Sequence, residues 1–297
     1  MRSSSNTGPL AAFCLMALIW GYNWVVMKIA LRYAGPLEFS AWRCALGVLL
    51  LFVVLAAFRV PLKPRELGKT IWLGLFQIFA FVALVAWALS SGAAGKSAVL
   101  AYTMPFWVIL FGWPLAEARP RGWQWLALAI AFTGLLLVLE LWRGEASLMS
   151  SALALGAGAA WAIGTLIFKR IPVRTHHELL SLTAWQMLFG AIPIVALALL
   201  VPERPIEWNT TFLAALAFNA VGAMAVATLL WLYILHRLPT TISSLSSLLV
   251  PIIGVLAAWL QLGERPSTAE SVGMVLILVA LAVLIVPQRV AQPITGD

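Results

Sequence analysis

The chain has 297 residues, of which 63% are hydrophobic and only 10% carry a charge. Soluble domains carry about 25% charged residues, so this composition excludes a soluble protein and indicates an integral membrane protein. The formal charge of +8 does not indicate nucleic-acid binding, because the basic residues lie in short connections between apolar runs. Cys14 and Cys44 both lie inside apolar runs, which argues against a disulfide framework and against a paired-cysteine metal site.

Ten apolar runs are separated by charged residues or by Pro and Gly. Each has roughly 20 residues, which is enough for a helix to cross about 30 Å of hydrocarbon. We therefore predict an all-α membrane protein with ten transmembrane helices. They cover residues 10–31, 38–58, 70–90, 93–115, 122–141, 148–168, 179–201, 211–232, 240–262 and 269–286.

Lys and Arg divide unevenly between alternate connections. With the N-terminus inside the cell, twelve lie on the cytoplasmic side, six lie on the opposite side and Arg43 lies within a span, which accounts for all 19. Cytoplasmic loops carry an excess of Lys and Arg, so this distribution predicts that both termini are cytoplasmic.

The two halves of the chain repeat the same features in the same order. The matches are Trp20 and Lys28 with Trp161 and Lys169, the segment 41–47 with 184–190, Phe76-Gln77 with Phe218-Asn219, and Pro105 with Pro251. We predict two five-helix repeats, at residues 1–145 and 146–297. Because five is odd, the second repeat enters the membrane from the opposite side. Such inverted repeats are typical of secondary transporters, whose substrate site lies near the midplane between the halves.

The chain resembles the drug/metabolite transporter superfamily in its EamA-type, ten-helix form, over essentially its whole length. The residues that carry the resemblance are Trp20-Gly21, Lys28, Arg43, Pro105 and Gly263-Glu264-Arg265-Pro266, with a weaker copy of the last motif around Glu117. The many aromatic residues are similar to those of YddG-type amino acid exporters. The resemblance implies two inverted five-helix repeats around a central cavity, a small organic cargo, and a place in the bacterial inner membrane.

The first span supplies the leading candidates for this cavity. Trp20, Asn23, Trp24 and Met27 share one helix face, because positions three and four apart are neighbours. A buried amide needs a partner or a wet cavity, so we expect Asn23 to face one or the other. In the sixth span Trp161 and Thr165 are the counterparts of Trp20 and Trp24, and Gly164 replaces Asn23 and is expected to make room. Simple packing against other helices remains the alternative for the tryptophans.

Other spans add polar and aromatic candidates. Gln77 and Asn219 are mid-span amides at matching positions, and hydrogen bonding between helices is their alternative role. Pro105 and Pro251 each free a backbone carbonyl and are predicted hinges. The predicted substrate-binding residues are Trp20, Asn23, Trp24, Gln77, Phe81, Tyr102, Trp107, Trp161, Thr165, Asn219 and Ser244.

Three cations lie within spans or at their ends. Arg43 is about 8 Å into its helix from Glu38, shallow enough for its side chain to reach the membrane surface, so an anchoring role is favoured over substrate contact. Lys28 and Lys169 lie near opposite ends of their helices. We interpret them as interfacial anchors, with a gating role as the alternative.

The acidic residues lie at span ends or in loops, which disfavours proton or sodium coupling through a buried carboxylate. Facilitated export or exchange fits better. Mid-span cations are almost absent and no acid faces the aromatics, which favours neutral, zwitterionic or apolar cargo over phosphorylated solutes and amines. Amino acids, especially aromatic or large apolar ones, are the first choice, and other metabolites or drug-like solutes are the alternative.

Other functional classes fit the sequence poorly. The histidines lie in loops and no catalytic constellation is visible, so an integral membrane enzyme is disfavoured. A channel is disfavoured because no ring of like polar groups is apparent. No metal site or cofactor is expected, and the expected partners are a small-molecule substrate and the lipid bilayer. The sequence leaves the oligomeric state open, the monomer included.

Overall fold

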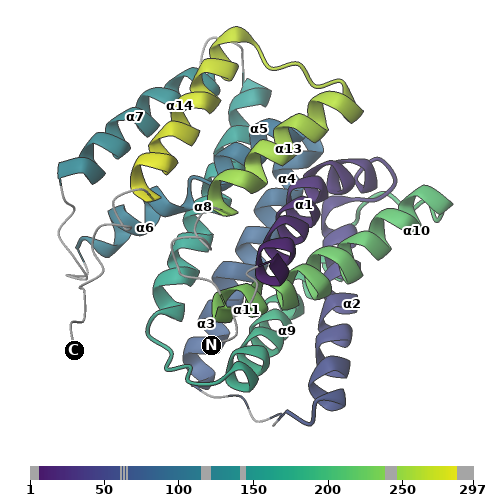
Figure 1. The fold of residues 1–297 in the computed structure, drawn as a ribbon. Coiled ribbons are helices and arrows are strands. Elements are labelled where there is room, and N and C mark those ends of the chain that lie inside the picture. Colours follow the sequence, from purple (N-terminus) through teal and green to yellow (C-terminus); the bar gives the residue numbers. More distant parts are fainter. Residues whose placement is uncertain are drawn as a thin grey trace, which may run out of the picture.

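The computed structural model describes residues 7–60, 62, 64, 66–114, 122–140, 145–237 and 246–285. Every regular element in these ranges is helical (Figure 1). The elements are α1 (Thr7–Ala30), α2 (Pro36–Ala57), α3 (Leu67–Gly74), η1 (Leu75–Ala80), α4 (Phe81–Ser91), α5 (Ala94–Ala101), α6 (Met104–Gly112), α7 (Gly122–Leu139), α8 (Glu145–Phe168), α9 (His176–Leu200), α10 (Thr210–Ala217), η2 (Phe218–Val226), α11 (Ala227–Arg237), α13 (Ser246–Leu262) and α14 (Thr268–Ile285).

These helices confirm the predicted all-α membrane fold. Eight helical segments of the described residues are long and apolar enough to cross a membrane, and α13 and α14 contain two shorter apolar helices, Leu249–Leu262 and Thr268–Val283. Three predicted spans are built from more than one element. The third comprises α3, η1 and α4, the fourth comprises α5 and α6, and the eighth comprises α10, η2 and α11.

The third and eighth spans change helix type at matching places. Each contains a π-helical segment, η1 in the first half and η2 in the second, and these segments hold the matched amides Gln77 and Asn219. A π-helical turn is rare and occurs frequently at functional sites. The two halves therefore share an irregularity of the backbone as well as a sequence pattern.

The predicted hinge prolines have different local settings. Pro105 lies in the first turn of α6, just after a turn at Tyr102 and Thr103 that ends α5. Proline is well tolerated there, because the first-turn N–H groups have no intrahelical partner. Pro251 instead lies inside the continuous helix α13. The fourth span is thus broken at its proline, whereas the described part of the ninth span continues through its own.

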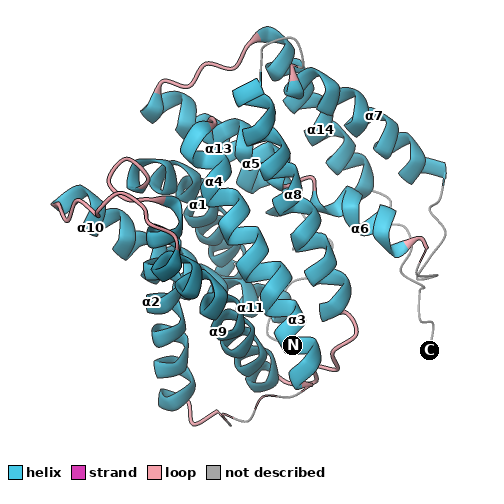
Figure 2. Ribbon diagram, turned by 180° about the vertical axis from the view of Figure 1, so that it is seen from behind, coloured by secondary structure: helices cyan, strands magenta, loops and turns pink. Residues whose placement is uncertain are grey.

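Helix packing follows a two-fold pattern that exchanges the halves. Helix α1 packs on α13 and on the η2–α11 span, and its counterpart α8 packs on α5, α6 and the α3–η1–α4 span. Helix α2 packs on its own counterpart α9, and α7 on its counterpart α14. Figures 1 and 2 show α7 and α14 side by side at one edge of the bundle. This exchange of partners is what two structurally similar repeats produce.

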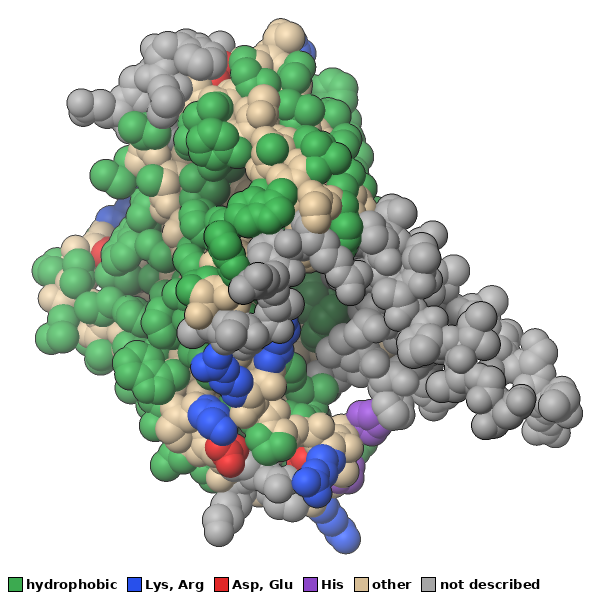
Figure 3. All heavy atoms as spheres, turned by 90° about the vertical axis from the view of Figure 1, so that its left-hand side faces the viewer, with side chains coloured by type: hydrophobic (Ala, Val, Ile, Leu, Met, Phe, Trp, Pro, Cys, Tyr) green, Lys and Arg blue, Asp and Glu red, His purple; other side chains and the backbone are tan. Residues whose placement is uncertain are grey.

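The two ends of the bundle differ in surface charge. We call the end where α1 terminates the Lys28 end, and the end where α8 terminates the Lys169 end. Figure 3 shows Lys, Arg and His side chains gathered at the bottom of the molecule, below a surface that is largely hydrophobic. The exposed basic side chains at the Lys169 end include Lys69, Lys169, Arg170 and Arg174.

Candidate functional site

A buried guanidinium lies where α1, α2 and η2 meet. Arg43 on α2 is only 4% exposed, and its Nη1 donates a hydrogen bond of 3.0 Å to Oδ1 of Asn219 on η2. The same Nη1 contacts the sulfur of Met27 on α1, and the guanidinium carbon lies 5.6 Å from the centre of the Phe39 ring. The predicted anchoring of Arg43 at the membrane surface is therefore replaced by inward burial, because the side chain turns toward Asn219 rather than along its helix.

Asn23 extends this polar region along α1. It lies one helical turn before Met27 on the same face, it is 9% exposed, and its Oδ1 is buried without a hydrogen-bond partner in the described part of the chain. One turn further, Trp20 Nε1 donates to the Ala223 carbonyl of η2 over 3.1 Å. The Trp20, Asn23 and Met27 face of α1 thus runs along η2. We call Asn23, Met27, Arg43 and Asn219 the Arg43 cluster.

The depth of the Arg43 cluster follows from the helix rise of 1.5 Å per residue. Arg43 comes seven residues after Pro36, where α2 begins, and Asn23 comes seven residues before Ala30, where α1 ends. Both side chains therefore start about 10 Å inside the Lys28 end of their helices. The cluster therefore lies inside the bundle, about two helical turns from the Lys28 end of α1 and α2.

A second group of predicted residues forms an aromatic contact across the repeats. The rings of Phe81 and Trp161 lie edge to face with centres 4.7 Å apart, and Tyr102 approaches Trp161 at 5.9 Å. These separations fall in the favourable range for aromatic pairs, each worth about 0.5–1.5 kcal/mol beyond burial. We call the three residues, which come from the third, fourth and sixth spans, the aromatic cluster.

Trp24 and Trp107 are accommodated by their helical neighbours. Trp24 is 4% exposed and lies against α13, where a Cβ on Gly254 would be 3.4 Å from its ring. Trp107 Nε1 donates to the hydroxyl of Thr103, one turn earlier, over 3.2 Å, and its ring stacks on Phe111. These contacts agree with the alternative interpretation, in which the tryptophans pack against neighbouring residues and do not line a substrate cavity.

In the sixth span, Thr165 and Gly164 are also engaged in contacts within the protein. The Thr165 hydroxyl donates to the Trp161 carbonyl over 3.0 Å, within its own helix. A Cβ on Gly164 would lie 2.8 Å from the Cβ of Gln77 on η1. The prediction that Gly164 makes room is therefore wrong: the missing side chain lets α8 approach η1 closely, and Gln77 fills the space.

Lys28 and Lys169 have different surroundings. Lys28 Nζ donates to the Leu89 and Gly92 carbonyls, at 2.5 and 2.6 Å, and so joins the end of α1 to the end of α4. Lys169 is exposed. The Lys28 end has a further link, because the Glu264 carboxylate accepts hydrogen bonds from the backbone N–H groups of Ala94 and Gly95 where α5 begins.

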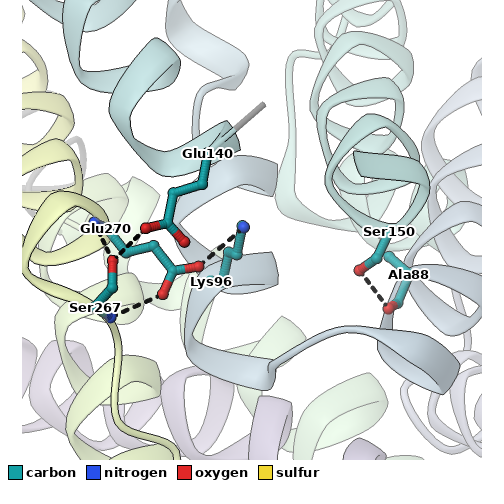
Figure 4. A network of polar contacts seen from close by, with 6 residues as sticks. All are labelled: Ala88, Lys96, Glu140, Ser150, Ser267 and Glu270. Atoms are coloured by element: carbon teal, nitrogen blue, oxygen red, sulfur yellow. Dashed lines mark hydrogen bonds and ion pairs between the residues drawn. The ribbon is translucent and has the colours of Figure 1, made fainter. Parts of the chain in front are cut away.

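A polar network that sequence reasoning missed lies at the same end, between α5, α7 and α14 (Figure 4). Lys96 and Glu270 form a salt bridge of 3.0 Å, and the Ser267 hydroxyl donates to Glu140 over 2.6 Å. A cavity of about 220 Å³ lies beside them, lined by Lys96, Glu264 and Glu270 among others. In the sequence, Glu264 and Glu270 beside the connection between the last two spans could have indicated a polar site here. No sequence spacing indicates that Glu140 would contact Ser267.

Ser244 lies outside the described residues. In the described part of the chain, no three His, Cys, Asp or Glu side chains are arranged so that they could hold a metal ion. The described helices thus bring together two groups of predicted residues, the Arg43 cluster and the aromatic cluster. One contiguous apolar core that contains Met27 and Tyr102, with Phe81 packed against it, links the two clusters.

An all-helical membrane bundle whose halves exchange packing partners, with a polar cluster buried within it, has the architecture of a secondary transporter. The model of the EamA-like transporter family matches residues 7–140 and, a second time, residues 148–286. The chain therefore belongs to the EamA-like transporter family, which confirms the predicted resemblance and the presence of two repeats in a multi-pass membrane protein.

Two bacterial relatives and one solved structure agree with this assignment. A protein of Escherichia coli (strain K12) named "Probable amino-acid metabolite efflux pump" is 29% identical over 288 residues, covering 94% of each chain. "Uncharacterized transporter YoaV" of Bacillus subtilis (strain 168) is 25% identical over 268 residues, covering 88% of this chain and 91% of its own. A solved structure described as "Crystal structure of protein" has a TM-score of 0.65 over 96% of this chain and 99% of its own, and at 17% identity it supports the fold alone.

Proposed function

We propose that this transporter exports amino acids, with a preference for aromatic or large apolar side chains, by alternating access between its two repeats. The observation that carries the proposal is the aromatic cluster. Phe81, Tyr102 and Trp161 come from three different spans, so a ring placed among them would contact both halves of the protein at once. The E. coli relative's name, an amino-acid metabolite efflux pump, supports the same class of cargo.

We infer the orientation of the protein in the membrane from the charges at its two ends. The exposed basic residues at the Lys169 end favour a cytoplasmic position for that end, with both termini inside and the protein in the inner membrane. The Lys28 end then faces outward. There, Lys28 and Glu264 bind backbone groups of neighbouring spans, which suits a state closed to the outside. Alternating access requires these contacts to break when substrate leaves.

The aromatic preference can be tested by transport in proteoliposomes. We expect wild-type protein to exchange radiolabelled phenylalanine faster than alanine, and Trp161→Ala to lower phenylalanine flux about tenfold, the effect of losing 1–2 kcal/mol of ring contacts. Trp107→Ala is the matched control, because Trp107 stacks on its own helix and should matter less.

Two results would count against the proposal. One is wild-type flux that is absent for every amino acid but present for another metabolite class. The other is equal phenylalanine flux in wild type and Trp161→Ala. A strict requirement for a pH gradient would contradict export by facilitated transport or exchange. The coarser assignment to a membrane transporter does not depend on these outcomes.

A further inference from the structure

The Arg43 cluster contains an unused donor and an unused acceptor. Arg43 is 4% exposed, and its Nε is buried without a hydrogen-bond partner in the described part of the chain. Asn23 Oδ1 is likewise buried and unpartnered. Leaving such groups unsatisfied costs about 1–3 kcal/mol each, and more for a charged group. Two such groups where α1 and α2 meet η2, about 10 Å from the Lys28 end of α1 and α2, indicate a place for a ligand with both kinds of polar group.

The charge of Arg43 is also uncompensated. Its hydrogen bond to Asn219 and its contact with Met27 involve neutral partners, and it forms no ion pair with any described residue. An isolated cation inside a membrane is expensive, and such residues are usually found paired or on a substrate pathway. In contrast, Lys96, which is also buried, has a carboxylate partner in Glu270 at 3.0 Å. The Arg43 cluster is therefore the better candidate for an anionic group supplied from outside the chain.

We propose that the Arg43 cluster binds the zwitterionic head group of an α-amino acid, with its carboxylate on Arg43 and its ammonium on Asn23 Oδ1. Asn219 holds the guanidinium in place through Nη1 and leaves Nε for the ligand. Its amide is fixed in turn, because Nδ2 donates to the Ala215 carbonyl over 3.2 Å. The side chain of the amino acid extends toward the aromatic cluster. This inference rests on the proposed function, since it specifies how an amino acid cargo is recognised.

The proposal is tested by binding rather than by transport, so that the two can fail separately. Purified protein is titrated with phenylalanine, with phenylalaninamide, which lacks the carboxylate, and with 3-phenylpropanoate, which lacks the ammonium. Apparent Kd values come from ligand-induced thermal stabilisation. We expect wild type to bind phenylalanine at least about tenfold more tightly than either analogue, as expected for a charge-assisted hydrogen bond.

Two variants separate the two contacts. Arg43→Gln should weaken binding of phenylalanine and phenylpropanoate about 10- to 100-fold and leave phenylalaninamide within about twofold. Asn23→Leu should weaken phenylalanine and phenylalaninamide and spare phenylpropanoate. Unchanged binding of one analogue in each variant shows that the variant is folded. Lys169→Gln is the control for loss of a positive charge, because Lys169 is exposed at the other end.

Several outcomes would overturn the head-group assignment. Equal losses for all three compounds in Arg43→Gln would make Arg43 a purely structural residue. Unchanged phenylalanine binding in both variants would place recognition elsewhere. A wild type that binds none of the compounds would refute both the head-group assignment and the amino acid cargo. If instead phenylalanine binds as expected but is not transported, the head-group assignment stands and the proposed export function fails.

Discussion

The Arg43 cluster and its counterpart in the other repeat occupy equivalent places on similar backbones but carry different side chains. Asn23, Arg43 and Asn219 correspond to Gly164, Gln186 and Gln77. The first set contains a buried cation and an unpartnered amide oxygen, whereas in the second set Gly164 is packed closely against Gln77. Both sets include a π-helical segment. The two repeats thus share a scaffold, and at these matched positions only the first repeat carries a charge, at Arg43.

This difference bears on how an inverted repeat can be selective. A symmetric scaffold supplies two equivalent conformations, open to either side, but a small substrate needs only one set of head-group contacts. A second buried Arg at residue 186 would add another desolvation cost without a second ligand to offset it. The neutral residues of the second set instead let η1, α8 and α9 pack tightly against one another, so we expect these three helices to move little relative to one another.

The largest expected effect concerns this tight packing. A Cβ on Gly190 would lie 2.6 Å from the Gly74 carbonyl oxygen, whereas a Cβ on its counterpart Gly47 would meet Met224 and Met187 side-chain atoms at 3.0 and 3.3 Å. A backbone carbonyl oxygen at 2.6 Å has to be displaced with its helix, whereas contacts at 3.0 and 3.3 Å need shifts of only a few tenths of an ångström. We expect Gly190→Ala to destabilise the protein by about 3 kcal/mol and Gly47→Ala by about 1 kcal/mol or less. Thermal unfolding in one detergent measures both, and equal losses would contradict the contrast.

The next comparison removes the two matched amides. Asn219→Leu deprives a buried guanidinium of its hydrogen bond at 3.0 Å, whereas Gln77 is half-buried on the neutral side. We expect phenylalanine affinity to fall about tenfold in Asn219→Leu and less than about threefold in Gln77→Leu. Titration of both variants by thermal stabilisation gives the ratio. A larger loss for Gln77→Leu would mean that the neutral side recognises the head group.

The smallest expected effect concerns the two matched lysines. Lys28 binds two carbonyls at the Lys28 end, whereas Lys169 is exposed. Lys28→Met should favour opening of that end by about fivefold, which corresponds to about 1 kcal/mol. Ser97 is buried in the first turn of α5, near the Lys28 end. The readout is the labelling rate of Ser97→Cys by a water-soluble thiol reagent, in a background without Cys14 and Cys44. Lys169→Met should leave the rate unchanged. If both lysine variants were labelled at the same rate, the proposed role of Lys28 in closing that end would be refuted.

The hydropathy pattern predicted most of the fold. The spans are encoded locally in runs of apolar residues, and the repeat is visible in matched residues such as Trp20 and Trp161. The ten segments and two halves could therefore be predicted without knowledge of tertiary contacts. Helix irregularities were harder to foresee. Neither Gln77 nor Asn219 carries a local signal for π-helical geometry, which depends on how the third and eighth spans pack against their neighbours.

The site was predicted less completely, for a physical reason. The position of Arg43 along its helix gave its depth but not its direction, and a long side chain can reach either the surface or the core. Its direction is set by Met27 and Asn219, which lie on other helices. The same limit applies to Gly164, whose missing side chain allows either space or close contact. Only the position of Gln77 decides between them.

The most direct test of a one-sided head-group site is an experimental structure with bound 4-iodophenylalanine, in which anomalous scattering locates the iodine. We predict the iodine at the aromatic cluster of Phe81, Tyr102 and Trp161, and the carboxylate within hydrogen-bond distance of Arg43. A carboxylate bound beside Gln186, or a ligand bound in the cavity lined by Lys96 and Glu270, would contradict the account.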